Sequence, residues 1–191
     1  MQSKDNKRSE EYQERLFGKR FKGAKLSRVS LPRSAVRKVL GWIKKPKHFL
    51  VMVGPAGTGK TYFCAAMLDE MIDKVRHIRA YDERTLLKKV RNSIGESSKG
   101  DYLDCLRVLL DDDLIILDDI GSSGHTDWRE EVLMEAIDYR YYSMLPTIVT
   151  SNLYKKEFFE TYGQRITSRL FAAENTIIDL SDMKDLREEG R

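Results

Sequence analysis

Short apolar runs alternate along the chain with longer stretches in which apolar residues recur every three or four positions. An uninterrupted apolar run is typical of a strand buried on both faces, whereas the three-to-four spacing is typical of a helix with one buried face. The runs predict strands at residues 49–53, 75–80, 114–117, 147–150 and 176–178. Strands that alternate with helices in this way predict an α/β fold, with a parallel five-stranded sheet flanked by helices.

The helical spacing fills the segments between these strands. Helices are predicted over residues 32–43 and 59–72, twice within 83–110 on either side of the polar stretch 95–100, from about residue 128, and over 157–171. A chain of 191 residues is long enough for one well-packed domain and hardly for two. We therefore expect a single core.

Charge is distributed unevenly along the chain. Residues 1–48 hold fifteen Lys and Arg against four Asp and Glu, although the formal net charge of the whole chain is only +4. The polar composition of residues 1–31 predicts a basic, flexible N-terminal arm ahead of a domain at residues 32–191. Such an arm could bind an acidic partner, either the phosphates of nucleic acid or an acidic protein face. The alternative is a tail that is simply solvated.

Cysteine content and hydropathy bear on the compartment. Cys64 and Cys105 lie in predicted helices without the CxxC spacing of a zinc site, so both are expected to be core thiols. The first residues contain no apolar segment of a secretion signal, and no run approaches the ~20 apolar residues that cross a bilayer. We therefore expect a cytoplasmic protein.

The segment VGPAGTGKTY follows the first predicted strand and combines glycines with a cation and a hydroxyl. It matches the pattern G-x-x-x-x-G-K-[ST] between a strand and a helix, as a phosphate-binding loop requires. Glycines let successive backbone N–H groups surround phosphate oxygens, and the N-terminus of a helix adds partial positive charge. The predicted nucleotide-binding residues here are Gly54, Pro55, Ala56, Gly57, Thr58, Gly59, Lys60, Thr61 and Tyr62.

The third predicted strand ends in two carboxylates, Asp118 and Asp119. Because the carboxyl ends of parallel strands meet at one edge of a sheet, these side chains are expected beside the phosphate loop. Lys60 is then expected to reach the β- and γ-phosphates of ATP, Thr61 and Asp118 to hold Mg²⁺, and Asp119 to orient an attacking water. The acidic run at residues 111–113 precedes the strand, and we expect a solvated turn at the opposite edge.

The order of the segments GPAGTGKT, LIILDDIG, TIVTSNL and RITSRL resembles the AAA+ ATPases of the initiator and loader branch, most closely the DnaC/IstB-like group. The resemblance covers roughly residues 32–187 and implies a P-loop NTPase fold, with Walker A at residues 54–61 and Asp118 and Asp119 as the Walker B pair. Only about a dozen residues follow the last predicted strand, so the helical lid of the family is expected to be absent or vestigial.

The resemblance also implies roles for residues outside the loop. Asn152 matches the sensor I position, where a polar side chain touches the γ-phosphate or the attacking water; a cap of the following helix is the alternative. Arg169 matches the arginine finger that reaches the nucleotide of a neighbouring subunit, and Arg165, four residues earlier, joins the nucleotide-binding residues. An ordinary surface ion pair is the alternative for this pair. The expected catalytic residues are Lys60, Asp119, Asn152 and Arg169.

Two further features bear on function. Asp119 stands where the family more commonly has Glu, and the shorter side chain predicts slow hydrolysis. Lys88, Lys89 and Arg91 belong to a predicted helical insertion in the region where initiator-type relatives contact single-stranded DNA, and could pair with backbone phosphates. A solvated helix face is the alternative interpretation.

The resemblance implies an ATP-hydrolysing DNA replication protein, a DnaC-like loader of the replicative helicase that binds single-stranded DNA and self-assembles with ATP into a homo-oligomer. ATP and Mg²⁺ are the implied cofactors. The arm is expected to bind the helicase or, in the alternative of an IstB-like helper, a transposase. Two further alternatives are a small P-loop kinase and a binding module in which ATP is only structural.

Overall fold

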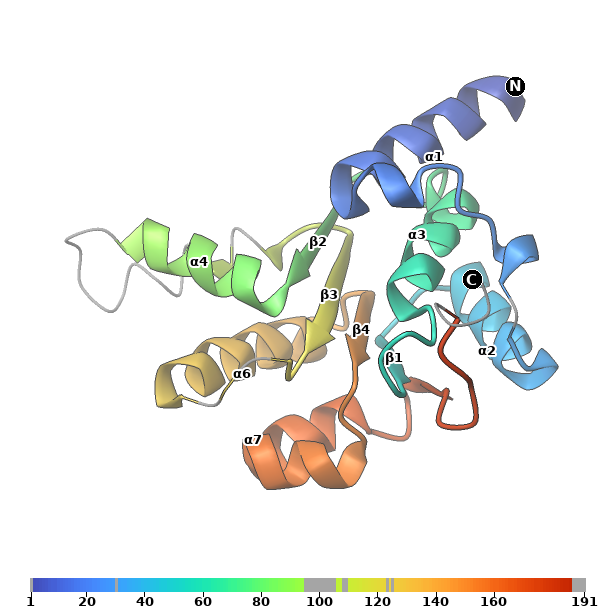
Figure 1. Cartoon of the computed structure of the whole chain (residues 1–191). Helices are drawn as coiled ribbons and strands as arrows, with labels where there is room; N and C mark the ends of the chain where they lie inside the picture. The colour runs from blue at the N-terminus through green and yellow to red at the C-terminus, as the bar shows by residue number, and fades with distance from the viewer. Residues whose placement is uncertain are drawn as a thin grey trace.

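A five-stranded parallel sheet forms the centre of the computed structural model, which describes residues 2–29, 31–94, 106–107, 110–122, 124 and 126–186, without the side chains of residues 2–6 and 93–94. The strand order is β2-β3-β4-β1-β5 (Figure 1). The strands are β1 (Phe49–Val53), β2 (Ile78–Asp82), β3 (Leu114–Ile120), β4 (Thr147–Ser151) and β5 (Thr176–Asp179). The predicted fold class is confirmed. The second strand begins at Ile78 rather than Val75, because the N–H of Val75 bonds to Met71 at the end of the preceding helix.

Helices cover both faces of the sheet. They are α1 (Gln2–Phe17), α2 (Arg33–Lys44), α3 (Lys60–Met71), α4 (Glu83–Ile94), α6 (Asp127–Tyr142) and α7 (Lys155–Leu170), with 3-10 turns η1 (Lys19–Phe21) and η2 (Leu26–Arg28). The second helix predicted within residues 83–110 lies almost wholly outside the described residues. Within the described part of the chain, no helix combines the length and the apolar character needed to cross a bilayer.

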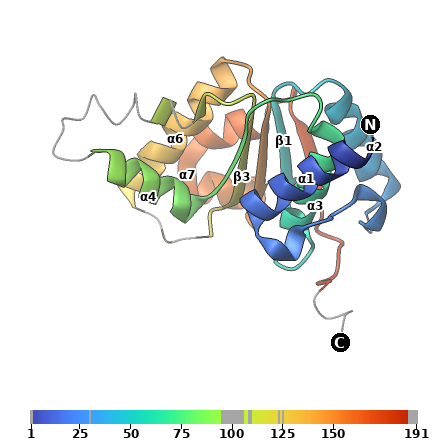
Figure 2. The same ribbon diagram turned by 90° about the horizontal axis from the view of Figure 1, so that it is seen from above.

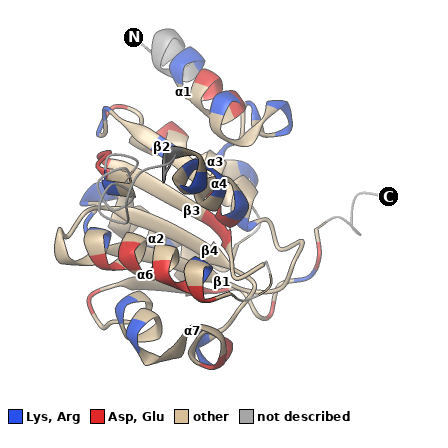
Figure 3. Cartoon of the chain, turned by 90° about the vertical axis from the view of Figure 1, so that its left-hand side faces the viewer, with Lys and Arg blue, Asp and Glu red and all other residues tan. Residues whose placement is uncertain are grey.

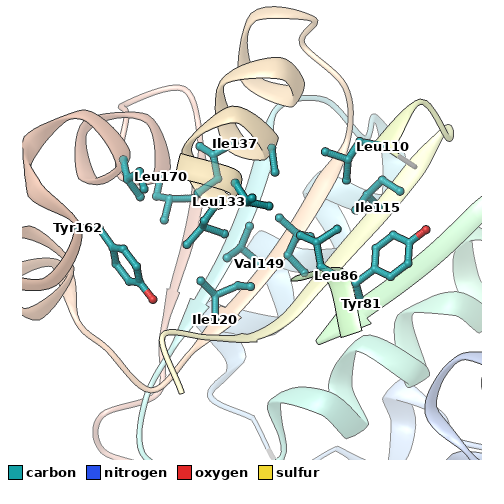
Figure 4. Packing of buried hydrophobic residues seen from close by; sticks show 14 of the residues in the cluster. Tyr81, Leu86, Leu110, Ile115, Ile120, Leu133, Ile137, Val149, Tyr162 and Leu170 are labelled. Carbon is teal, nitrogen blue, oxygen red and sulfur yellow. The ribbon is translucent and has the colours of Figure 1, made fainter. Parts of the chain in front are cut away.

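Each face of the sheet has its own apolar core. In β1, Phe49 and Val51 pack toward α4, α6 and α7, whereas Leu50 and Met52 pack toward α2 and α3. This alternation follows from the two-residue repeat of a strand, and it explains why the strand is apolar throughout. Figure 4 shows the first of these cores. Cys64 of α3 is fully buried in the second core, as expected, and Cys105 lies outside the described residues.

The N-terminal segment differs from the flexible arm that its composition predicts, because α1 and η1 lie against α3 (Figures 1 and 2). Gln13 of α1 is buried, and its Nε2 donates to the carbonyls of Ala24, at 2.9 Å, and of Ala65 in α3, at 3.1 Å. An ion pair of 2.7 Å joins Lys25 to Asp69 of α3. A buried amide with satisfied hydrogen bonds fixes a segment that is polar overall. The division of the chain at residue 32 stays a prediction.

Candidate nucleotide-binding site

The amino group of Lys60 lies within the loop that the glycine-rich motif predicts. Lys60 is the first residue of α3, and its Nζ donates to the carbonyls of Gly54, at 2.7 Å, and Pro55, at 2.8 Å, and to Oδ1 of Asn152, at 2.7 Å. Gly59 precedes it with φ 86°, in the left-handed region that a glycine adopts without steric cost. Two predicted site residues, Lys60 at the start of α3 and Asn152 directly after β4, therefore meet.

Asp118 is the centre of a second set of contacts. Its Oδ2 accepts a hydrogen bond of 2.8 Å from the Thr61 hydroxyl, and its Oδ1 accepts one of 2.6 Å from the Thr150 hydroxyl. Burial raises the pKa of Asp118, and the nearby Asp119 charge adds to this effect, although the hydroxyl groups oppose it. A hydroxyl in contact with a carboxylate oxygen fits Mg²⁺, which is bound by few protein oxygens together with phosphate and water.

Asp119 has a positive φ of 55°, which is uncommon for a residue other than glycine. The register between β3 and β4 shifts at this point, between Leu117 and Ile120. The N–H of Asp119 donates to the Thr150 hydroxyl at 2.8 Å, and its Oδ1 accepts a hydrogen bond of 3.0 Å from Asn152 Nδ2. The shift in the strand thus directs the Asp119 carboxylate toward the predicted sensor residue.

Asn152 connects the two sets of contacts. Its amide oxygen faces Lys60, and its amide nitrogen faces Asp119. The N-cap of α7 is Tyr154, whose N–H donates to Glu157 at 2.7 Å. The alternative in which Asn152 caps the following helix is therefore wrong.

The segment after β5 packs against the phosphate loop. The N–H of Leu186 donates to the Gly57 carbonyl at 3.0 Å. A Cβ atom at Gly57, where φ is 82°, would lie 2.1 Å from the Asp185 carboxyl group, and one at Gly54 would lie 2.8 Å from Cβ of Leu180. Glycine at these positions lets residues 180–186 come close to the loop. Among the described residues, this segment holds turns and no helix.

A cavity of about 910 Å³ lies beside the loop. Its wall contains many of the predicted residues: Ala56, Gly57, Gly59, Lys60, Thr61, Tyr62, Asp118, Asp119 and Asn152. The wall also contains residues that the sequence analysis did not select: Arg20, Phe21, Asp82, Arg84, Ser122, Thr150 and Leu186. Position at the carboxyl end of a parallel strand is a signal that would have found Asp82, Arg84 and Thr150. We find no comparable signal for Arg20 and Phe21.

Glu83, another residue that sequence analysis did not select, supports the segment after Asp119. Its side chain is buried; Oε2 accepts a hydrogen bond of 2.9 Å from the N–H of Gly121, and Oε1 pairs with Arg129 at 2.8 Å. An acidic residue at the start of α4 thereby holds the segment that follows the Walker B pair.

Arg165 and Arg169 lie on α7 and are bound to the same carboxylate. Arg165 donates to Oδ2 of Asp138 in α6 at 2.5 Å, and Nε of Arg169 forms an ion pair of 2.6 Å with Oδ1. Arg169 also donates to the Tyr142 hydroxyl at 2.6 Å. Burial disfavours the charged form of Arg169, but Asp138 and Tyr142 outweigh this and raise its pKa. Among the described residues, the cavity wall includes neither arginine.

The predicted DNA-binding residues share α4 but differ in their surroundings. Lys88 and Lys89 are exposed, and Figure 3 shows basic residues gathered on this helix. The guanidinium of Arg91 lies 4.8 Å from the ring centre of Trp128 at the start of α6. Because Leu86 and Val90 are buried in the core, the basic residues occupy the outward side of the helix. The role of these three residues in DNA binding stays a prediction.

A comparison with protein families decides the affiliation. The model of the family described as IstB-like ATP binding protein matches residues 29–172 of the chain. The chain belongs to this IstB-like family. Membership covers the phosphate loop, the Walker B pair and the arginine pair, and it agrees with the resemblance that the sequence motifs carry.

Individual relatives of this IstB-like chain cover less of it. The replicative helicase loader DnaI of Bacillus subtilis is 29% identical over 119 residues, which is 61% of this chain and 37% of DnaI. An ATP-binding protein of insertion sequence IS1162 from Pseudomonas fluorescens is 33% identical over 112 residues, which is 59% of this chain and 46% of the relative. The chain therefore spans less than half the length of either relative.

The fold of the IstB-like chain is shared with a solved loader structure. The crystal structure of the DnaC helicase loader has a TM-score of 0.68 and 24% sequence identity, over 84% of this chain and 99% of that chain. The likeness confirms the P-loop NTPase fold, with its parallel sheet flanked by helices, that the motifs predict. At this identity the likeness concerns the fold alone.

Proposed function

We propose that the chain binds ATP with Mg²⁺ and hydrolyses it slowly within a homo-oligomer, in which Arg169 of one subunit acts on the nucleotide of the next. The observation that carries the proposal is the continuous set of contacts from Lys60 through Asn152 to Asp119. A cation, a polar positioning residue and a carboxylate within one cavity are the groups that phosphoryl transfer to water requires.

Each residue has a role that follows from its contacts. Lys60 exchanges the Gly54 and Pro55 carbonyls for phosphate oxygens, because charged acceptors form the stronger hydrogen bonds. Thr61 and Asp118 hold Mg²⁺, which when bound neutralises charge that develops on the phosphates. Asp119 accepts a hydrogen bond from the attacking water, and the Asn152 amide keeps its carboxylate in place.

Slow turnover is expected from the identity and the surroundings of Asp119. Its side chain is one methylene shorter than the Glu that the family more commonly has at this position. The positive φ of Asp119 and its bond to Asn152 also restrict where the carboxylate can lie. An ATPase that hydrolyses slowly suits a protein whose assembly changes with the nucleotide.

The proposed action between subunits is supported by the location of the arginine pair. Arg165 and Arg169 are on α7, outside the wall of the cavity in their own chain. Among the described residues, the arginines in that wall are Arg20 and Arg84, so Arg169 can neutralise a transferred phosphoryl group only when the nucleotide is bound by a second copy. Asp138 and Tyr142 limit the rotamers that Arg169 can adopt, and this favours its presentation to a neighbour.

Loading of a replicative helicase is the client activity that we propose, with single-stranded DNA bound along α4 by Lys88 and Lys89. The name of the Bacillus subtilis relative, replicative helicase loader DnaI, supports this choice. The relative from insertion sequence IS1162 and the family description favour a second candidate, an ATPase helper of a transposase. In either case the basic N-terminal segment is the proposed partner-binding element.

The decisive experiment measures phosphate release against protein concentration, with and without single-stranded DNA. We compare the wild type, Arg169→Ala and the control Arg37→Ala, which alters an exposed arginine of α2. Activity per subunit is expected to rise with concentration and with DNA. Arg169→Ala is expected to lose about 100-fold or more, while its nucleotide affinity stays near that of the wild type. Activity per subunit that is independent of dilution and retained by Arg169→Ala would contradict the proposal.

The client is tested by capture on the immobilised full-length chain, with ATP present. Recovery of a purified replicative helicase from the same source supports loading, and recovery of the transposase supports the second candidate. Phosphorylation of a small acceptor by the monomeric protein would instead support a P-loop kinase.

A further inference from the structure

The N-terminal segment forms part of the wall around the candidate nucleotide site. Arg20 and Phe21 of η1 line the same cavity as Lys60, Thr61 and Asp118. Predictions from sequence motifs place the whole site after residue 48, so this contribution from the basic arm is unexpected. In Figure 2, α1 and the turn that follows it lie over α3, the helix that begins with Lys60.

The turn is held in a defined position relative to the phosphate loop. The N–H of Gly23, where φ is 74°, donates to Oε1 of Gln13 at 2.8 Å, and Nε2 of Gln13 donates to the Ala65 carbonyl of α3 at 3.1 Å. Phe21 contacts Phe17 edge to face, with ring centres 6.1 Å apart. Since a buried amide is costly unless its hydrogen bonds are made, these contacts select one arrangement of η1 on α3.

Phe21 and Tyr62 connect this arrangement to the loop itself. Both pack against the small cluster of Ala24, Ala65 and Ala66. Tyr62 follows Thr61, the residue whose hydroxyl contacts Asp118. The turn therefore rests on the second turn of α3, directly after the first turn, whose backbone N–H groups face the phosphate site.

The side chain of Arg20 is exposed and lines a cavity whose wall also contains the cations Lys60 and Arg84, together with three aspartates. Within the described part of the chain, its guanidinium has no hydrogen-bond or ion-pair partner. A guanidinium presents several N–H donors in a fixed plane that matches the oxygens of phosphate, and its charge persists at all physiological pH values. The polyphosphate chain of a nucleotide bound at Lys60 is the nearest ligand class with this chemistry.

We propose that Arg20 binds the phosphate chain of the nucleotide held by its own subunit, so that nucleotide binding and docking of the N-terminal segment on α3 reinforce each other. The inference rests on the proposed function only in that ATP occupies the cavity. Because coupling between two sites is reciprocal, a protein partner that draws residues 7–29 away from α3 weakens nucleotide binding. The position of the segment proposed to bind the client then depends on whether nucleotide is bound.

Nucleotide affinity provides the first test, with a fluorescent ATP analogue and the full chain. The variants are Arg20→Ala, the conservative Arg20→Lys, and the matched control Lys19→Ala, which removes the neighbouring exposed cation of η1. Loss of one charge-assisted contact is expected to weaken binding about tenfold in Arg20→Ala. Arg20→Lys should lie between this variant and the wild type, and Lys19→Ala should bind within about twofold of the wild type. Unchanged thermal unfolding of all three variants verifies their folding.

Hydrogen exchange provides the second test. An arginine with a merely structural role would not make protection of the turn depend on nucleotide. A non-hydrolysable ATP analogue should slow exchange of the amides of residues 18–24 in the wild type, less so in Arg20→Ala, and not at all in Lys60→Ala. Wild-type affinity in Arg20→Ala, or no protection of the turn, would overturn the inference while leaving ATP binding intact. A loss confined to single-stranded DNA affinity would reassign Arg20 to nucleic acid. A wild type that binds no nucleotide would overturn this inference together with the proposed function.

Discussion

The carboxyl edge of the sheet and the α6–α7 face both carry conspicuous charged side chains, but they hold them in different ways. At the edge, Lys60, Asn152 and Asp119 bond to one another, and Asp118 accepts from two hydroxyl groups. On the α6–α7 face, the side chains of Arg165 and Arg169 remain 54% and 20% exposed, while both bind the Asp138 carboxylate, which is 9% exposed.

The two regions differ in the ligand that each is expected to contact. The groups at the sheet edge satisfy one another, so a nucleotide has to exchange their mutual contacts for its own. Both arginines are bound by the single carboxylate of Asp138, and they keep N–H donors at the surface. A side chain that acts on another molecule needs such exposed donors. The first region is expected to determine affinity, and the second to determine the rate of hydrolysis.

The largest expected effect is that of Lys60→Ala, which breaks the sheet-edge region. The variant loses the cation that replaces two loop carbonyls with phosphate oxygens, so nucleotide affinity should fall at least about 100-fold. Binding is measured by titration with a fluorescent ATP analogue. Lys45→Ala on the surface serves as the control and should bind as the wild type does. Near-normal affinity in Lys60→Ala would contradict the proposal that the loop binds the phosphates of the nucleotide.

A smaller effect is expected when the anchor of the arginine pair is changed by Asp138→Asn. The neutral amide no longer fixes Arg169, so hydrolysis in the assembled state should fall about tenfold, while nucleotide affinity stays the same. Stability should fall by about 1–3 kcal/mol, because the Arg169 guanidinium, on a side chain that is 20% exposed, loses its counter-ion. The control Asp127→Asn changes an exposed carboxylate of the same helix. Equal loss of affinity and rate would show that the two regions are not separable.

The smallest effect is a gain in stability on Asp118→Asn, measured by denaturant unfolding without metal or nucleotide. Burial raises the pKa of Asp118 above the ordinary range, so the folded state binds this proton more tightly than the unfolded state. Its contribution to stability is therefore present at acidic pH and is lost as pH rises through the raised pKa. At neutral pH the variant should be more stable than the wild type, and the difference should vanish toward acidic pH. A variant that is less stable at neutral pH would contradict this assignment of cause.

The sheet and the phosphate site could be predicted from sequence because local patterns encode them. Each apolar run is short and buried on both faces. Polar residues follow it and lie at the carboxyl edge of the sheet, as in Leu114 to Asp118. Thr150, at the end of β4, obeys the same rule, although it took the structure to reveal its bonds to Asp118 and Asp119. Local signals of this kind do not require knowledge of distant partners.

Other residues are determined by partners far away in the sequence. Arg140 is fully buried, with hydrogen bonds to the Thr147 hydroxyl and to the carbonyls of Leu110 and Asp112, and burial lowers its pKa to about 10. Gln13 likewise depends on a contact with α3. From sequence alone, a polar residue is predicted to be exposed to solvent, because its buried hydrogen-bond partners are not known. For this reason the folded N-terminal segment was not predicted.

The central claim is that the nucleotide site of one subunit is completed by an arginine of another. Its most direct test mixes two variants that should each be inactive, Lys60→Ala, which keeps Arg169, and Arg169→Ala, which keeps the phosphate loop. We expect phosphate release to recover on mixing and to be greatest near equimolar ratio, because Arg169 of the first variant then acts on nucleotide bound by the second. Mixed oligomers that form and yet show no recovery at any ratio would contradict the claim.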